Sequence, residues 1–387
     1  MAELLKDQLS LNKINRLAQA VSRQACDEHS VFNIDSFQQA LPAASLWQEL
    51  TLMKRLRSAA QAFYDVMPEG HGADIILATL KNNNQLSSWL SLVCCEYVAI
   101  NDNVAVAKGL FLLQQMTEFF SAEFAIRHYL LKQPEITLMV LKTWLKHDNY
   151  HVRRLISEGT RPRLPWGVRL PLFIEQPDRV MPLLSALKDD EQEYVRRSVA
   201  NHLNDIAKDH PELVIATAKA WLAEKSLASL TAIQKKNRIK LIRHACRTLL
   251  KQGNSEVLEI FGYLPVTDVS CSLLSSSTKV PFSGDFEFEL ILEKTSDAEQ
   301  ESLLMIDYVV HFQKANGKTA AKVFKWLDRR LTKVGIERIR KKHSFKKIST
   351  RKYYPGLHRL EVMVNGEKKA QIEFELLNNG HVDLTAS

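Results

Sequence analysis

The sequence predicts a mainly α-helical protein in which a solenoid of helical repeats is followed by a small all-β domain. Three observations support this prediction. Apolar residues recur every three or four positions from residue 1 to about 262, a motif repeats within that region, and beyond about residue 280 apolar and polar residues alternate instead. With 387 residues the chain exceeds the usual size of one domain, so two domains are expected.

The region 1–263 carries the pattern of stacked helical pairs. Proline is sparse there and glycine lies mainly where periodic segments end, as expected of helices. VRRLISEG begins at Val152 and VRRSVANH begins 43 residues later at Val195, while IRHACRTL follows at Ile242 after 47 more. This spacing is typical of HEAT-like repeats, which stack into a curved solenoid with a concave face. We therefore predict a HEAT-like solenoid over 1–263.

The remaining chain is expected to form strands. Residues 264–279 are rich in serine and threonine and predict a linker. The region 280–387 contains the alternating segment FEFELIL at 286–292 and, at 360–376, two alternating runs separated by Asn365-Gly366, a strong hairpin signal. Several short strands in about 100 residues are typical of an immunoglobulin-like sandwich. The Cys, Trp, Cys spacing of true immunoglobulin domains is not found.

Composition narrows the partners and the compartment. Lys+Arg 52 against Asp+Glu 44 gives a formal charge of +8, which favours a polyanionic partner but also suits an ordinary basic protein. The five cysteines form no C-x-x-C pair and no Cys/His spacing for zinc, so we predict no disulfide framework, metal or cofactor. The N-terminus lacks the apolar core of a secretory signal, and the longest apolar run, 89–100, is too short to span a bilayer. A cytoplasmic protein with no membrane partner is expected.

The repeated motifs predict basic rows on the solenoid. Equivalent positions in stacked repeats fall into columns. Forked guanidinium groups in such columns suit phosphate oxygens, which predicts a basic track that follows a nucleic-acid backbone. The alternative is a solvated polar face. The expected first row is Arg153, Arg196 and Arg243, and the second is Arg154, Arg197 and His244.

Acidic residues stand among these basic positions. Glu158 follows Arg154 by one turn, Asp205 lies two turns beyond Arg197, and Glu123 begins a helix upstream. Each acid alone is more often an ion-pair partner or a helix-dipole charge. Carboxylates beside phosphates weaken binding unless they act on a cation, and an N-alkylated purine is a cation whose departure leaves positive charge on the deoxyribose. A second carboxylate could position or deprotonate the attacking water.

The loop SEGTRPRLPW, 157–166, ends one of the repeated helices. Pro162 and Pro165 fix φ and remove donors, so the backbone after the helix is stiff. Trp166 at the end of the loop offers a π face that could lie against a cationic base or sugar. The alternative is that this tryptophan anchors the loop in the core.

Three segments carry a family resemblance: SAEFAIRHYL at 121–130, HVRRLISEGTRPRLPW at 151–166 and YVRRSVANHLNDIAKDHPELV at 194–214. They resemble the AlkC branch of the AlkC/AlkD HEAT-like-repeat DNA glycosylases, over about residues 1–262. The resemblance implies a DNA alkylation-repair enzyme that needs no metal or cofactor and grips a bent duplex on its concave face. It implies removal of cationic N-alkylated bases without flipping them into a pocket. Among these bases, 3-methyladenine is expected, and 3-methylcytosine and 7-methylguanine stay open.

The resemblance also assigns roles to single residues. Glu123, Glu158 and Asp205 match the acidic active-site positions, and Trp166 matches the aromatic that contacts the substrate. We expect Glu158 and Asp205 to face the sugar, with Glu158 rather than Glu123 activating water. The side chains expected to bind DNA are Arg153, Arg154, Arg161, Arg163, Arg196, Arg197, Arg243, His244, Lys341, Lys342, Lys346 and Lys347.

The β domain adds a second basic segment. Some AlkC-like proteins carry a C-terminal immunoglobulin-like domain, and residues 280–387 resemble that arrangement. Thirteen Lys/Arg residues and only two acids lie between Lys322 and Lys352, with Phe324, Trp326 and Phe345 among them. This predicts a clamp on the duplex backbone or minor groove, and the alternative is a solvated sheet face.

Two functions from different classes therefore remain. The first is a monomeric, nucleoid-associated glycosylase acting on double-stranded DNA that contains alkylated bases. The second is a non-enzymatic HEAT-repeat scaffold that binds nucleic acid or protein through the same basic face.

Overall fold

Helices fill the chain up to Ile260, as the three- and four-residue spacing of apolar side chains predicts. The computed structural model describes residues 5–86, 88–101, 103–224, 226–295, 302–348 and 351–378. The chain divides into two units, the first formed by 1–214 with 220–245 and the second by 215–219 with 246–387. Within the described residues, no helix combines the length and the apolar character needed to cross a membrane.

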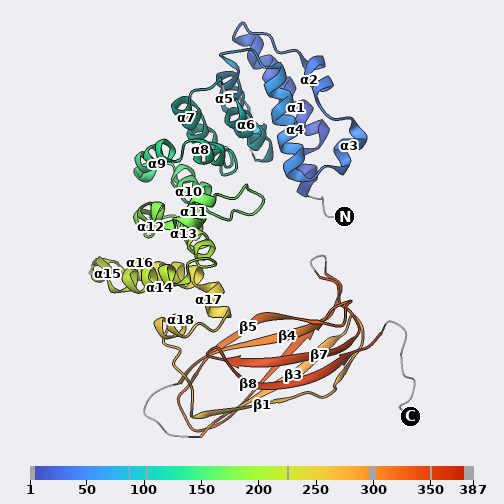
Figure 1. Cartoon of the computed structure of the whole chain (residues 1–387), viewed down its shortest axis with the longest axis vertical. Helices are drawn as coiled ribbons and strands as arrows, with labels where there is room; N and C mark the ends of the chain where they lie inside the picture. The colour runs from blue at the N-terminus through green and yellow to red at the C-terminus, as the bar shows by residue number, and fades with distance from the viewer. Residues whose placement is uncertain are drawn as a thin grey trace. The chain divides into compact units, whose positions relative to one another are not determined.

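Pairs of stacked helices build the first unit as a HEAT-like solenoid (Figure 1). Helix α10 packs on α13, and α13 packs on α16. Their contact faces are apolar, because Val152, Leu155 and Ile156 of α10 and Val195 and Val199 of α13 are fully buried. The helical elements are η1 (Leu5–Leu9), α1 (Leu11–Asp27), α2 (Ile34–Ala40), α3 (Ala44–Glu49), α4 (Leu52–Val66), α5 (Gly72–Asn82), η2 (Asn84–Leu86), α6 (Trp89–Ile100), α7 (Val106–Met116), α8 (Ile126–Lys132), α9 (Pro134–Thr143), η3 (Trp144–Lys146), α10 (Tyr150–Gly159), α11 (Pro171–Glu175), η4 (Pro177–Arg179), α12 (Met181–Leu187), α13 (Glu193–Ile206), α14 (Pro211–Ala223), α15 (Ser226–Ser229), α16 (Ala232–Ala245), α17 (Arg247–Lys251) and α18 (Ser255–Ile260).

Only two of the three predicted motif copies occupy the same place in their helices. Val152 lies near the start of α10 and Val195 near the start of α13, whereas Ile242 lies near the end of α16. Arg243 and His244 therefore do not continue the rows begun in the first two copies, and the sequence prediction of three-membered rows is wrong. The match at Ile242 rested on a few similar letters, while α16 begins ten residues earlier.

The second unit contains a β-sandwich of two sheets. One sheet has the strand order β1-β3-β6 and the other has the order β2-β8-β7-β4-β5. The segment predicted as a linker, 264–279, instead supplies β1, whose serine-rich sequence suits the exposed face of an edge strand. The strands are β1 (Val269–Leu274), β2 (Lys279–Val280), β3 (Asp285–Lys294), β4 (Ser302–Gln313), β5 (Thr319–Leu331), β6 (Gly335–Ser344), β7 (Gly356–Val364) and β8 (Glu367–Leu376).

Alternating side chains of the two sheets meet in an aromatic core. Phe286 of β3 stacks on Phe374 of β8 with ring centroids 4.0 Å apart. Phe345 is fully buried, and Phe324 and Trp326 pack against the same core. These three aromatic side chains therefore stabilise the sandwich, which corrects the expectation that they lie among the basic residues of a DNA-binding surface.

The predicted Asn365-Gly366 turn joins β7 to β8 and also holds the helical end of this unit. Both residues have positive φ, 46° and 79°, as a tight hairpin requires. The Asn365 amide donates to the carbonyl oxygen of Leu264 over 2.7 Å. A Cβ built on Gly366 would lie 2.7 Å from the Cα of Gly253, so the two backbones touch. This contact needs glycine on both sides.

We predict that Gly253→Ala lowers the free energy of unfolding of the second unit by about 2–4 kcal/mol, because the new methyl group meets the hairpin backbone and φ is +71°. Urea unfolding followed by tryptophan fluorescence measures the change. Gly317→Ala is the matched control: its φ is +75° but nothing lies within 4 Å of its built Cβ. Equal losses in the two variants would show that the backbone contact contributes nothing.

Candidate active site

Helix α10 and the loop after it place the central carboxylate. Asn149 caps the helix, because its Oδ1 accepts from the backbone N–H of His151 over 2.9 Å. The helix ends at Gly159, and the Thr160 hydroxyl donates to the Ile156 carbonyl over 2.6 Å before Pro162 prevents continuation. Glu158 lies in the last turn.

Glu158 is buried and has three donors. Arg161 Nη1 lies 2.7 Å from Oε1, Ser198 Oγ donates to Oε2 over 2.6 Å, and Arg154 Nη2 lies 3.5 Å from Oε1. Burial alone would raise the pKa of this carboxyl, but the two arginines and the hydroxyl outweigh it and hold the pKa below its ordinary value. Glu158 is therefore a fixed negative charge at neutral pH.

Asp205 joins the same cluster from α13. Its Oδ2 accepts from Arg161 Nε over 2.8 Å, and its Oδ1 accepts from Lys208 Nζ over 3.0 Å. One guanidinium therefore bridges Glu158 and Asp205, which come from neighbouring repeats. The Asp205 side chain is almost fully buried, whereas that of Lys208 is 45% exposed, so the cluster reaches solvent on the side of Lys208.

Glu123 extends the cluster from the turn before α8. Its Oε2 lies 2.8 Å from Arg154 Nη1 and accepts from the Ser121 hydroxyl over 3.0 Å. The Arg154 guanidinium also lies 4.5 Å above the ring of Tyr194, which is 42% exposed. The structure thus brings the three predicted acids together. They alternate with cations in the order Glu123, Arg154, Glu158, Arg161, Asp205 and Lys208.

A buried arginine outside the predicted set holds the loop after α10. Arg127 of α8 is fully buried and donates to the carbonyl oxygens of Gly159 over 2.9 Å, Arg161 over 2.7 Å and Val168 over 2.7 Å. Burial and the nearby Arg161 charge lower its pKa to about 10, so it stays cationic at neutral pH. On this loop Trp166 is 59% exposed and has φ +65°. A tryptophan that only anchored the loop would be buried.

Arg153 and Arg196 differ from the exposed row that the sequence predicts. Both are almost fully buried, and each donates to the carbonyl oxygens five and six residues earlier in the chain. Arg153 also forms a two-pronged pair with Asp190. These two side chains close the turn before each helix, so we assign them a role in the fold and none in DNA binding.

Two further predicted basic residues of the solenoid, Arg197 and Arg163, lie nearer the surface. Arg197 is exposed on α13. Arg163 forms a two-pronged ion pair with Asp209, with both distances 2.8 Å. Its side chain is partly exposed, so the pair borders the loop that carries Trp166.

The predicted lysines of the β domain lie at the end of β6 and just beyond it. Lys342 is exposed and pairs with Glu287 of β3 over 2.6 Å, while Lys341 is half-buried. Lys346 and Lys347 are exposed. Glutamates of β3 thus offset part of the positive charge that the sequence of this segment suggests.

Sequence reasoning missed several members of the cluster. Tyr194 stands directly before VRRS, as His151 and Tyr150 stand before VRRL, so an aromatic before the motif in both copies was a usable signal. Ser198 and Arg127 had no such signal, because their partners come from other helices.

The chain is similar in sequence and in structure to several known proteins. Residues 270–378 match the family model of the C-terminal Ig-like domain of the uncharacterised protein YhaZ. The uncharacterised protein YhaZ of Bacillus subtilis (strain 168) is 35% identical over 333 residues, which cover 85% of this chain and 88% of YhaZ. The structure of the Pseudomonas fluorescens alkylpurine DNA glycosylase AlkC, bound to DNA containing an abasic site analog, is 32% identical. It matches with a TM-score of 0.85 over 97% of this chain and 100% of AlkC.

We predict that Arg127→Met lowers the free energy of unfolding of the first unit by at least about 3 kcal/mol, since it leaves several buried carbonyl oxygens without a donor. Urea unfolding measures the change, and limited proteolysis should show faster cleavage in the loop that carries Trp166. Arg163→Met makes the same substitution within that loop at a partly exposed pair and should change the stability little. If both variants unfold alike, Arg127 does not hold the loop.

Proposed function

Because this chain belongs to the AlkC branch of the AlkC/AlkD family of HEAT-like-repeat proteins, we propose that it is a DNA glycosylase that removes alkylpurines from duplex DNA. The observation that supports this function best is the cluster of Glu123, Glu158 and Asp205. Three carboxylates from three elements converge at one place and are held by arginines, beside a loop that exposes Trp166. A surface that only gripped phosphates would have no use for them.

The reaction that we propose uses the carboxylates of Glu158 and Asp205, which Arg161 holds in place. When the bond between the sugar and an N-alkylated base breaks, its electron pair leaves with the base and neutralises it. Positive charge then builds on the deoxyribose, and carboxylates that are already oriented and ionised stabilise it without reorganisation. Water attacks the sugar carbon and gives up a proton, leaving a free base and an abasic site.

The lowered pKa of Glu158 limits its ability to take a proton from the attacking water. A carboxylate with a depressed pKa is a weak base but a lasting negative charge at neutral pH. Attack on a fully developed sugar cation needs little proton abstraction, so Glu158 acts mainly by stabilising the cation and orienting the water. Glu123 pairs with Arg154 and positions that arginine.

Trp166 supplies the contact to the lesion in this proposal. An exposed indole on a stiff loop can lie against a cationic nucleotide, and its positive φ is backbone strain of the kind that functional loops retain. Since the carboxylates act on the sugar, the base need not be flipped into a pocket. Cationic lesions such as 3-methyladenine are the expected substrates, with 3-methylcytosine and 7-methylguanine as further candidates.

The remaining parts of the proposal concern binding. Arg154, Arg161, Arg163 and Arg197 stand in or beside the cluster and would contact the strand that carries the lesion. The exposed Lys346 and Lys347 of the β domain would add contacts to the duplex. We propose that the protein works as a monomer in the cytoplasm, at the nucleoid.

We predict that Glu158→Gln and Asp205→Asn each slow base release by about 10²–10³-fold, because each removes a charge that stabilises the transition state. Release of free 3-methyladenine from methylated duplex DNA, measured by chromatography under single-turnover conditions, tests this. Binding to DNA with an abasic-site analogue should be nearly unchanged. Asp209→Asn, one turn beyond Asp205, is the control and should keep the wild-type rate.

A non-enzymatic scaffold gives a different result in the same assay. Its acids would only hold helices together, so the wild-type protein would bind DNA and release no base. That outcome, or equal rates in Glu158→Gln and wild type, would overturn the glycosylase proposal.

We predict that the pH profile of base release depends on Arg154. Glu158 has a lowered pKa, so activity should persist from neutral pH to below the ordinary range of a carboxyl group and fall only as Glu158 is protonated. Arg154→Gln removes a positive charge that favours the ionised form of Glu158, while the burial of Glu158 stays. The pKa of Glu158 therefore rises, and the acid limb of the pH profile moves to higher pH. Rates measured from pH 8 down to below the ordinary carboxyl range, and corrected for spontaneous depurination, give the shift, with Arg163→Gln as control. An unmoved limb would mean that another group titrates.

A further inference from the structure

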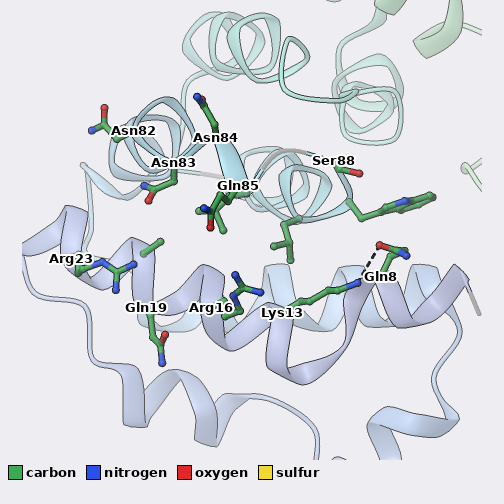
Figure 2. A pocket seen from close by; sticks show the side chains of 14 residues that line it. Gln8, Lys13, Arg16, Gln19, Arg23, Asn82, Asn83, Asn84, Gln85 and Ser88 are labelled. Carbon is green, nitrogen blue, oxygen red and sulfur yellow. Dashed lines mark hydrogen bonds between the residues drawn. The ribbon is translucent and has the colours of Figure 1, made fainter. Parts of the chain in front are cut away.

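A groove whose described lining residues include positively charged but no negatively charged side chains lies outside the carboxylate cluster. It runs between α1 and the connection from α5 to α6, and its volume is about 600 Å³. Figure 2 shows Lys13, Arg16 and Arg23 on the side of α1 that faces Asn83 and Gln85 across the groove. All of these elements belong to the first unit.

Two cations of the groove, Arg16 and Arg23, lie among mostly uncharged neighbours. None of the 14 described residues that line it is an aspartate or a glutamate. Arg16 and Arg23 are exposed, and neither forms an ion pair with a carboxylate among the described residues. By contrast, the buried arginines Arg153, Arg161 and Arg238 of this solenoid are bound by acids. An unmatched pair of arginines therefore indicates an anionic ligand.

The opposite wall offers uncharged donors and an aromatic ring. Asn84 and Gln85 present exposed amides. Trp89 also lines the groove and packs on Phe120 with ring centroids 5.5 Å apart. The wall thus supplies hydrogen-bond donors for phosphate or sugar oxygens without adding negative charge.

One chain segment connects the edge of the groove with the carboxylate cluster. The backbone N–H of Ser88 at its edge donates to the Phe119 carbonyl oxygen over 3.3 Å. The same chain segment continues from Phe120 to Ser121 and Glu123, which both contact Arg154. The groove and the carboxylate cluster are therefore linked through residues 119–123 of the first unit.

We propose that this groove binds the phosphate backbone of duplex DNA on one flank of the lesion, an inference that rests on the proposed function. Lys13, Arg16 and Arg23 share one face of α1 and span ten residues, or about 15 Å along the helix. One strand of B-DNA presents about four phosphates over that length. A compact anion such as a mononucleotide would be met by converging donors, whereas a row of cations fits an extended backbone.

The test compares two variants that lose the same charge. Arg16→Gln/Arg23→Gln removes two cations from the groove, and Lys142→Gln/Lys146→Gln removes two exposed cations from α9 and η3. Affinity for a duplex with an abasic-site analogue is measured by fluorescence anisotropy across a salt series. The groove variant should bind roughly tenfold more weakly, with the slope of log K against log salt reduced by about 2. The control should stay within about twofold of wild type, since its cations contact no phosphate.

Truncated duplexes locate the contact. Shortening the duplex on the flank that occupies the groove should weaken wild-type binding but add no loss in the groove variant, and shortening the other flank should weaken both alike. Equal affinities of the groove variant and the control overturn the proposal. Loss of binding to deoxyadenosine monophosphate or inorganic phosphate, with unchanged duplex affinity, also overturns it in favour of a small-anion site.

The outcomes separate this inference from the proposed function. The groove residues do not contact the reacting atoms, so at saturating protein the groove variant should release base at the wild-type rate. If wild type releases no base but the groove variant binds DNA more weakly, the groove stands and the glycosylase proposal falls. If wild type releases base and the groove variant binds DNA as tightly as wild type, the glycosylase proposal stands and the groove proposal falls.

Discussion

The bridge that Arg161 makes between Glu158 and Asp205 determines the rest of the site. It joins the end of α10 to α13 in the next repeat with two bonds of 2.7 and 2.8 Å. A buried ion pair adds little net stability, because removing its charges from water costs several kcal/mol and apolar side chains often serve as well. Its value here lies elsewhere, because it holds two carboxylates in one orientation and close together. In the proposed reaction this is what a developing sugar cation requires.

The repeat motif divides its two arginines between fold and site. In VRR the first arginine, Arg153 or Arg196, turns inward and binds the carbonyl oxygens of the preceding turn. The next residue lies about 100° around the helix, where Arg154 pairs with Glu123 and Glu158 and Arg197 is exposed. Arg153 thus fixes the start of α10, which sets where Arg154 and, one turn later, Glu158 emerge. A short motif can in this way repeat through the solenoid for structural reasons and still supply site residues in one copy.

Local sequence patterns predicted the fold well and the site in part. The helical spacing, the VRR copies and the Asn365-Gly366 turn each depend on neighbours in sequence, and the structure bears them out. The acids at Glu123, Glu158 and Asp205 were found because they interrupt a basic pattern. Burial could not be foreseen in the same way. Arg153 and Arg154 are adjacent arginines, and only the packing of α10 decides which of them binds the preceding turn and which joins the carboxylate cluster.

The errors share one cause, since each concerns how a segment packs against others. The Ser/Thr-rich segment before residue 280 has linker composition but supplies β1, because an edge strand tolerates polar side chains on its exposed face. The match at Ile242 resembled the motif but fell at the end of α16. Phe324, Trp326 and Phe345 alternate with cations as in a nucleic-acid surface, yet the alternation of a strand sends them into the core.

Charge is distributed unequally along the solenoid, and this has a consequence for the proposed function. In the carboxylate cluster three acids alternate with three cations, so the local charge nearly cancels. In the groove beside α1 the cations face amides instead. A polyanion is therefore drawn most strongly to the groove, whereas the cluster neither attracts nor strongly repels the backbone. Affinity then comes mainly from contacts remote from the reacting sugar, and the acids remain available to the cation that forms there. In this proposal the cations of the groove bind the DNA backbone, and the acids of the carboxylate cluster act on the sugar.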